Sequence, residues 1–142
     1  MNKTLRNKAL AGASKLLEAD VNGETWYTDT FVATKHDIFE GYKPRKYQED
    51  YRGKQKPNLG SIIGKQDLKL AEFEDVITDG ELELKKISNI DGQAEHVNKR
   101  YADLVESIYP NAVPWLDMNT KLAPVHYRVG FDTVAVIMPI RY

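Results

Sequence analysis

Two segments of the chain repeat apolar residues at the spacing of an α-helix, and runs of β-forming residues separate them. In the first segment, Leu5, Ala9, Gly12 and Leu16 recur at steps of three and four residues. This spacing predicts an amphipathic helix near residues 4–18, with one apolar stripe facing a core. The basic side chains of the segment lie off that stripe.

The second segment is EHVNKRYADLVESIYP, in which Val97, Tyr101, Leu104 and Ile108 form a stripe of the same kind. Pro110 follows just past the last apolar position, which is typical of a helix end. We therefore expect a second helix near residues 95–108. Because both helices have one apolar face, they are expected to pack on the same face of a sheet.

The residues between and after the helices favour strands. TWYTDTFVATKHDIFEGY is rich in β-formers, and Leu82, Leu84 and Ile87 alternate with polar residues. Three more short strands are expected at 115–116, 124–129 and 134–138, whereas the apolar residues of 59–78 fit either a strand or a short helix. The predicted fold class is α+β, with two helices on one face of an antiparallel β-sheet.

Residues 43–58, KPRKYQEDYRGKQKPN, contain two prolines and no aliphatic side chain, which predicts an exposed loop. Basic side chains bind phosphates and tyrosines stack on bases, so a nucleic-acid-binding loop is one reading and a solvated loop is the other. The basic and aromatic residues in question are Lys43, Arg45, Lys46, Arg52, Lys54 and Lys56, with Tyr42, Tyr47 and Tyr51.

Composition sets the broad class. The chain has 142 residues, 42% hydrophobic and 29% charged, which fits one domain over 1–142 and is too apolar for disorder. The net charge of −1 means that any nucleic-acid contact needs a local basic face. The chain has no cysteine, no apolar run of membrane-spanning length and no signal-peptide pattern. We expect no membrane association and a cytoplasmic location, in a host cell if the gene is viral.

No pattern predicts catalysis. His36, His96 and His126 are scattered, and none has a second histidine at the spacing of a helical metal site. No nucleophile, base and orienting acid can be grouped from the sequence. We therefore expect a protein that is not an enzyme and needs no metal or cofactor.

The C-terminal third resembles the last domain of the bacterial sliding clamp, the β subunit of the replicative DNA polymerase. In that family a helix opens with a pattern like F-N-x-x-Y-L-x-x-L, and the chain stops at a strand ending V-V-M-P-M-R. Here HVNKRYADLVESI, LAPVHYRV and VAVIMPIRY are similar to these phrases, and FVATKHDIFEG is a fainter echo of a third. The likeness covers residues 95–142 well and 5–41 weakly. A clamp chain holds three such domains, so a single-domain relative, encoded by a phage or another mobile element, would account for the length.

Two surfaces are candidates for binding. If the apolar stripe of the first predicted helix packs on a sheet, its basic side chains face outward and could contact DNA without reading its sequence, although they could also form a solvated face. The candidates on the two helices are Lys3, Arg6, Lys8, Lys15, Lys99 and Arg100. The second surface is implied by the resemblance: in the family, the terminal strand lines a shallow apolar pocket that binds short peptides of polymerases and repair factors. The positions that match the pocket are Leu122, Pro124, Val136, Met138, Pro139, Ile140 and Arg141.

The first reading is therefore a non-enzymatic clamp-like processivity factor of DNA replication, which binds double-stranded DNA without sequence preference. Because one domain cannot encircle DNA, a ring requires a homo-oligomer. A second reading is a clamp-fold protein that binds or inhibits a host clamp or polymerase without binding DNA. A third is a nucleic-acid-binding module that uses the basic, tyrosine-rich loop.

Overall fold

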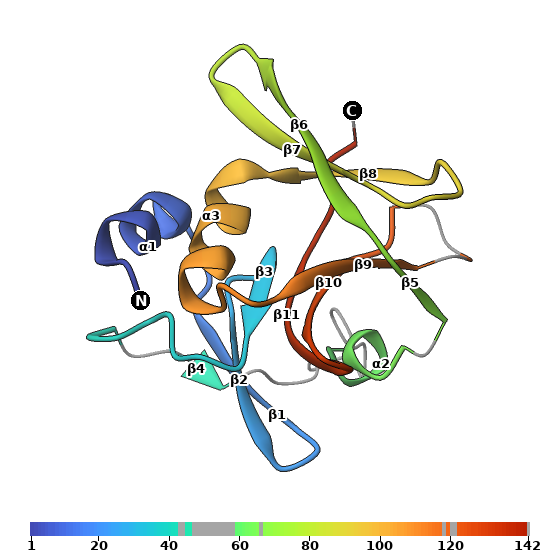
Figure 1. Ribbon diagram of the computed structural model, residues 1–142. Coiled ribbons are helices and arrows are strands. Elements are labelled where there is room, and N and C mark those ends of the chain that lie inside the picture. Colours follow the sequence, from blue (N-terminus) through green and yellow to red (C-terminus); the bar gives the residue numbers. More distant parts are fainter. Residues whose placement is uncertain (43–44, 47–58, 66, 118, 120–121, 142) are drawn as a thin grey trace.

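The computed structural model describes residues 1–142 except 43–44, 47–58, 66, 118, 120–121 and 142 (Figure 1). Helices and strands alternate along the chain, and the described part contains three helices and eleven strands. In chain order they are α1 (Lys3–Leu10), β1 (Leu17–Val21), β2 (Glu24–Thr28), β3 (Val32–Thr34), β4 (Arg45–Lys46), α2 (Leu59–Ile63), β5 (Leu68–Leu70), β6 (Glu72–Asp79), β7 (Leu82–Ser88), β8 (Ala94–Asn98), α3 (Lys99–Ile108), β9 (Val113–Asp117), β10 (Val125–Val129) and β11 (Asp132–Ile137).

The large sheet has the strand order β4-β1-β2-β3-β11-β10-β9-β5, and every described pairing in it is antiparallel except β1 with β4. The fold class is therefore α+β, as the sequence predicts. The strand order also reveals two units with the same connection, α1-β1-β2-β3 and α3-β9-β10-β11. Their last strands, β3 and β11, pair at the middle of the sheet.

The registers show how closely the two units correspond. At the centre, Ala33 of β3 lies opposite Val136 of β11. One strand outward, Thr28 lies opposite Ala33 in the first unit and His126 lies opposite Val136 in the second. One residue earlier in β2 and β10, Tyr27 lies opposite Thr34 and Val125 lies opposite Ile137. Thr28 and His126 thus occupy equivalent positions of the two units, which the linear sequence does not reveal.

The inner face of the sheet holds the main core. Ala135 and Ile137 point to this face, with Val125 and Tyr127 of β10, and all four are fully buried. Both α1 and α3 contribute to the same cluster, and they lie side by side in Figure 1. Both main helices thus reach the core on this side of the sheet, and α1 packs against α3.

The outer face of the sheet is covered differently. Val136 points away from Ala135 and Ile137, because successive side chains of a strand alternate, and it packs with Trp26, Ala33 and Leu59 in a second cluster. Leu59 belongs to the short helix α2, so this helix covers the outer face. The two sides of the sheet are thus a two-helix side and a side with one short helix.

The second sheet, β6-β7-β8, is joined to the first at both ends. The Ala71 amide, between β5 and β6, donates to the Pro114 carbonyl of β9 at 2.9 Å. The Ile140 amide, just after β11, donates to the His96 carbonyl of β8 at 2.7 Å. The two sheets are therefore linked twice, once beside β6 and β9 and once beside β11 and β8. The buried face of α3 packs against the core that they enclose.

The first helix is shorter than predicted. It ends at Leu10, Gly12 adopts a φ of +79°, and residues 17–21 form β1 instead of a further helical turn. Leu17, Ala19 and Val21 fit the two-residue period of a strand, and Ala19 and Val21 are buried in the second cluster. Pairing with β2 therefore overrides the helical reading of this segment.

The remaining predicted helices and strands can also be compared with the structure. The second predicted helix begins at Lys99 rather than at residue 95, because Ala94–Asn98 pairs with β7 as β8. Leu68, Leu70 and Phe73, which fitted two structures, lie in strands β5 and β6. The strand predicted around Leu82–Ile87 is β7, and the three C-terminal strands are β9, β10 and β11. Most of the predicted 43–58 loop lies outside the described residues.

Candidate nucleic-acid interface

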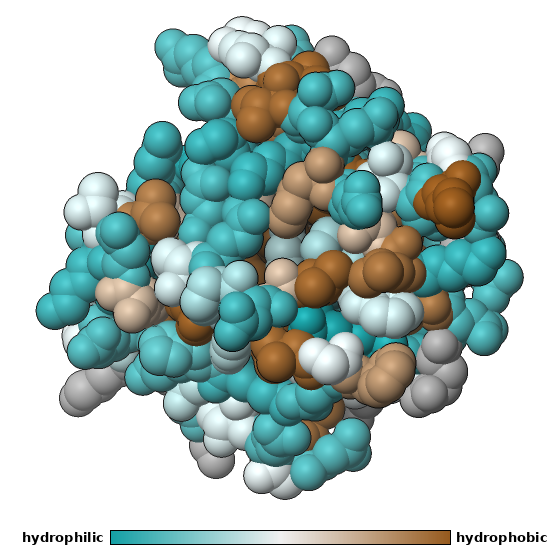
Figure 2. Space-filling view, viewed as in Figure 1, coloured by the Kyte–Doolittle hydropathy of each residue, from teal (hydrophilic) through white to brown (hydrophobic). Residues whose placement is uncertain are grey.

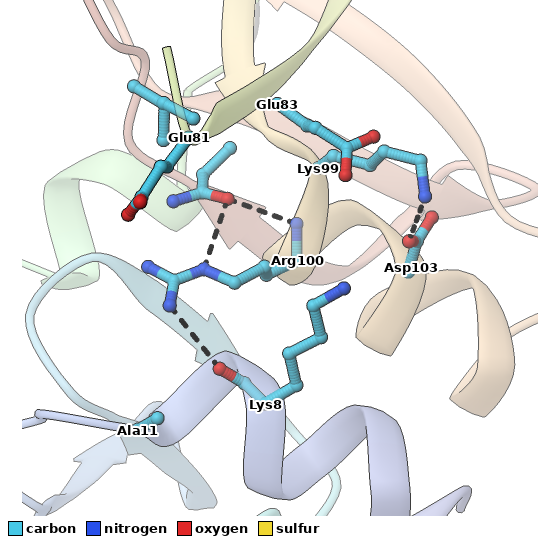
Figure 3. Close-up of a pocket in the computed structure, with 9 residues that line it drawn as sticks. Lys8, Ala11, Glu81, Glu83, Lys99, Arg100 and Asp103 are labelled. Atoms are coloured by element: carbon cyan, nitrogen blue, oxygen red, sulfur yellow. Dashed lines mark hydrogen bonds and ion pairs between the residues drawn. The ribbon is translucent and has the colours of Figure 1, made fainter. Parts of the chain in front are cut away.

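A groove between the two main helices brings together three of the predicted DNA-contacting cations. It has a volume of about 460 Å³ and lies between the end of α1, the β6–β7 turn and the first turn of α3. Lys8 comes from α1, and Lys99 and Arg100 open α3 (Figure 3). Lys8 is 91 positions from Lys99 and 92 from Arg100, and only the packing of α1 on α3 makes it their neighbour.

Arg100 is held in place at the mouth of this groove. Asn98 caps α3, and its Oδ1 accepts from the Arg100 amide at 3.0 Å and from the Arg100 Nε at 3.4 Å. The guanidinium also donates to the Lys8 carbonyl at 3.5 Å (Figure 3). Because all these partners are neutral, the Arg100 charge is not cancelled by the contacts that orient it.

Lys99 is in a different position. Its Nζ donates to Asp103 Oδ2 at 2.6 Å, and this hydrogen bond is the main cause that raises the pKa of the lysine. Asp103 also pairs with Lys85 at 3.3 Å. Glu81 and Glu83 line the same groove. The interior of the groove is therefore charge-balanced, and a polyanion would meet the exposed cations beside it rather than fill it.

Those exposed cations lie on α1. The helix contains Lys3, Arg6 and Lys8 and no carboxylate, so its exposed face carries Lys3 and Lys8. In Figure 2 the region over α1 and α3 is mostly hydrophilic, whereas hydrophobic residues gather in the middle of the view, over β9 and α2. The α1–α3 face, defined here by Lys3, Lys8 and Arg100, is the polar face of the two-helix side.

Two of the predicted contacts do not lie on this face as expected. Arg6 is 7% exposed and its Nη1 donates to the Glu40 carbonyl at 3.0 Å, so the outward orientation predicted for it is wrong. Its guanidinium packs over the Tyr42 ring, 5.4 Å from the centroid. Lys15 lies beyond the helix, in the connection to β1, so its predicted place on α1 is also wrong.

The residues predicted to line a C-terminal pocket are partly brought together. Val125 lies opposite Ile137, so Pro124 and Met138 are adjacent across β10 and β11. Leu122 and Ile140 both reach β8, through bonds to the Glu95 carboxylate and the His96 carbonyl. Met138, Pro139 and Ile140 are half-buried, and Leu122 and Arg141 are exposed.

Val136 lies apart from the other residues predicted to line the C-terminal pocket. It is 4% exposed and packs against Trp26 and Leu59 beneath α2. The prediction that Val136 lines an accessible pocket is wrong, because the strand alternates and the outer face at this point is covered by a helix. The surface available at the C-terminus is therefore smaller than the resemblance implies.

The three histidines lie in different environments. His126 is buried on the outer face, and burial lowers its pKa to about 4, with the positive charge of Arg128 acting in the same direction. His36 is exposed, and His96 belongs to β8. Within the described residues, no three His, Asp or Glu side chains gather in a way that could hold a metal ion.

One site was not predicted from the sequence. A second groove, on the outer face of the large sheet, is lined by Trp26, Lys35, Lys65, Trp115, Arg128 and Phe131. Arg128 lies over the Trp115 ring at 5.0 Å, and Lys35 lies 6.0 Å from the Trp26 ring. These residues come from five separate segments, so no spacing in the sequence could have grouped them. The sequence pattern indicates only that the two tryptophans lie in strands.

None of the helices in the described part of the chain is both long enough and apolar enough to cross a membrane. Comparison with protein-family models, curated proteins and solved structures gives no significant match.

Proposed function

We propose that the protein is a clamp-like accessory factor of DNA replication, which contacts double-stranded DNA through the α1–α3 face. The observation that carries the proposal is the pair of α-β-β-β units, whose two helices lie side by side on one face of a continuous sheet. This arrangement agrees with the sequence resemblance to a sliding-clamp domain, which also places two helices on one sheet face.

The charge of the face supports the same proposal. Lys3 and Lys8 are exposed on a helix without carboxylates, and the oriented guanidinium of Arg100 lies next to the Lys8 carbonyl. Such a set of side chains binds phosphates without reading the base sequence. A clamp acts by encircling DNA and sliding, so a modest number of cations is enough. A ring would require several copies of this chain.

The test is a charge reversal on the face. The double variant Lys8→Glu/Arg100→Glu should bind a labelled DNA duplex more weakly than the wild type. If both side chains contact phosphates, the slope of log affinity against log salt should fall by about 1.8, or roughly 0.9 for each contact. Lys69→Glu is the matched control, because Lys69 lies on β5 at the far edge of the sheet and is paired with Asp91.

Two results would contradict the proposal. One is the absence of any duplex binding by the wild type at low salt and high protein concentration. The other is an equal loss of binding in Lys69→Glu, which would indicate a general charge effect. Melting curves of each variant show whether the fold is intact, and the native mass shows whether the chain assembles into a ring.

A second candidate function is docking of a partner peptide at the C-terminus, which is the basis of the alternative that the protein binds a clamp or polymerase. It is favoured by the convergence of Leu122 and Ile140 on β8, with half-buried Met138 two residues before Ile140. Met138→Ala should weaken binding of a clamp-binding peptide while Val136→Ala mainly lowers stability, because only Val136 is buried. If the peptide does not bind the wild type in a titration, this candidate is excluded.

A further inference from the structure

The outer groove combines aromatic rings and cations on the side of the sheet opposite to the α1–α3 face. Its volume is about 600 Å³, and it runs between the β1–β2 hairpin, the end of α2, strand β9 and the β10–β11 turn. The side chains of β9 and β10 that line it, Trp115 and Arg128, share the face of Val136 rather than that of Ile137. The groove is thus separate from the surface proposed to hold duplex DNA.

The aromatic part of the groove is open to solvent. Phe131 lies in the β10–β11 turn and is 87% exposed, although phenylalanine is a residue that folding normally buries. Its ring centroid is 6.4 Å from that of Trp115, with the planes inclined at 56°. Because the two planes are inclined, a planar ligand can stack on the exposed phenylalanine ring while the half-buried tryptophan borders it.

The cations of the groove differ in how they are paired. Lys35 binds both Glu24 and Asp132 at 3.0 Å, and Lys65 lies 3.5 Å from Asp117. Arg128 donates only to neutral oxygens, the Thr133 hydroxyl at 3.3 Å and the Lys65 carbonyl at 3.4 Å. No carboxylate among the described residues pairs with it. The guanidinium is half-buried over Trp115, so an incoming anion can bind it without displacing a carboxylate.

We propose that this groove binds single-stranded nucleic acid, with a base stacked on the exposed Phe131 ring beside Trp115 and a backbone phosphate on Arg128. Stacking platforms beside backbone-binding cations are the common design of single-strand binding sites. In a duplex the bases are already stacked on one another and cannot reach the two rings. An apolar peptide would bury Arg128 without giving it an anion, which is unfavourable.

The test measures binding of fluorescein-labelled oligo(dT) by fluorescence anisotropy to three proteins: the wild type, Phe131→Ala and Phe31→Ala. Phe131→Ala should weaken binding between about fivefold and a hundredfold, the range measured for the loss of one stacking ring. Phe31→Ala is the matched control, because Phe31 is also an exposed phenylalanine, 57% accessible, but lies at the opposite end of β3 from Lys35. Its binding should equal that of the wild type.

Arg128→Gln tests the phosphate contact. It should weaken oligo(dT) binding and reduce the slope of log affinity against log salt by roughly 0.7, the value for one contact to a single strand. Stacking should also quench the fluorescence of Trp115, and the quenching should be absent in a Trp115→Phe variant. Because Phe131 is exposed, Phe131→Ala should keep the fold. The stacking contact can therefore be tested even if Arg128→Gln does not fold.

The proposal is overturned if the wild type does not bind oligo(dT), if Phe31→Ala is as weak as Phe131→Ala, or if thymidine monophosphate binds as tightly as the oligonucleotide. The last result would indicate a site for free nucleotides. The Lys8→Glu/Arg100→Glu protein should keep its affinity for oligo(dT), so failure of the duplex proposal and failure of this one give different results.

Discussion

The two α-β-β-β units share their connection but not their composition. Both helices begin with a lysine that follows an asparagine cap, Asn2-Lys3 in α1 and Asn98-Lys99 in α3. Counted from the caps, Leu104 and Val105 of α3 are fully buried, whereas Lys8 and Ala9 occupy the same positions in α1. The unit α3-β9-β10-β11 thus supplies the larger share of the core, and α1 supplies charge.

The difference between the units suggests a division of labour within one architecture. A helix that buries large aliphatic residues on two adjacent positions is fixed by packing, so its sequence has little freedom there. A helix that buries mainly an alanine and the stem of an arginine contributes less to stability and can carry functional cations on its exposed face. The following predictions compare residues of the two units, from the largest expected effect to the smallest.

Leu104→Ala should lower the free energy of unfolding by about 2–5 kcal/mol, because it removes a fully buried side chain and leaves a cavity. Lys8→Ala, at the equivalent position of α1, should change stability by less than about 0.5 kcal/mol. Urea unfolding of both variants measures the contrast. A similar loss in the two variants would show that α1 is as important to the core as α3.

His126 should make stability depend on pH, whereas its counterpart Thr28 does not titrate. The pKa of His126 is lowered from 6.5 to about 4 by burial and by Arg128 and Lys65, with Asp117 opposing. Between pH 6.5 and about pH 4, His126 binds a proton in the unfolded chain but not in the folded protein. Stability is therefore fully present above pH 6.5 and falls by roughly 3 kcal/mol as the pH drops to 4.

His126→Gln is the matched variant for this effect. Urea unfolding at several pH values should show a smaller loss of stability between pH 6.5 and 4 than in the wild type. Carboxylates that titrate in the same range affect both proteins equally, so only the difference between them is interpreted. Parallel stability curves for the two proteins would mean that His126 is accessible to protons in the folded state.

The smallest effect is expected at two tyrosines of the sheet, Tyr127 of β10 and Tyr27 of β2. The Tyr127 hydroxyl is buried and has no hydrogen-bond partner among the described residues, whereas Tyr27 is only half-buried. Removing an unsatisfied hydroxyl relieves its desolvation cost, so Tyr127→Phe should raise the melting temperature, with a gain in stability of about 1 kcal/mol. Tyr27→Phe should leave it nearly unchanged. A clear loss in Tyr127→Phe would show that the hydroxyl has a partner, such as a buried water.

The sequence predicts the elements better than their limits. The helical period identifies α1 and α3, and the two-residue period identifies β7 and the C-terminal strands, because these patterns depend on local geometry alone. The helical period also extends the first predicted helix through Leu16 and Leu17, because apolar residues there fit both the helical period and the two-residue period of a strand. The choice is made by pairing with β2, which is a contact that a local pattern does not contain.

The candidate functional residues likewise divide into features that the sequence determines and features that only the tertiary structure determines. The amino-acid sequence by itself determines that the chain is α+β, that its first helix carries several cations, and that residues 134–138 form an apolar strand. Only the tertiary structure decides that Arg6 and Val136 are buried, that Lys8 meets Arg100, and that Arg128, Trp115 and Phe131 form one groove. The reason is physical: exposure and charge pairing depend on which strands become neighbours, and neighbouring strands here join residues that are far apart in the sequence.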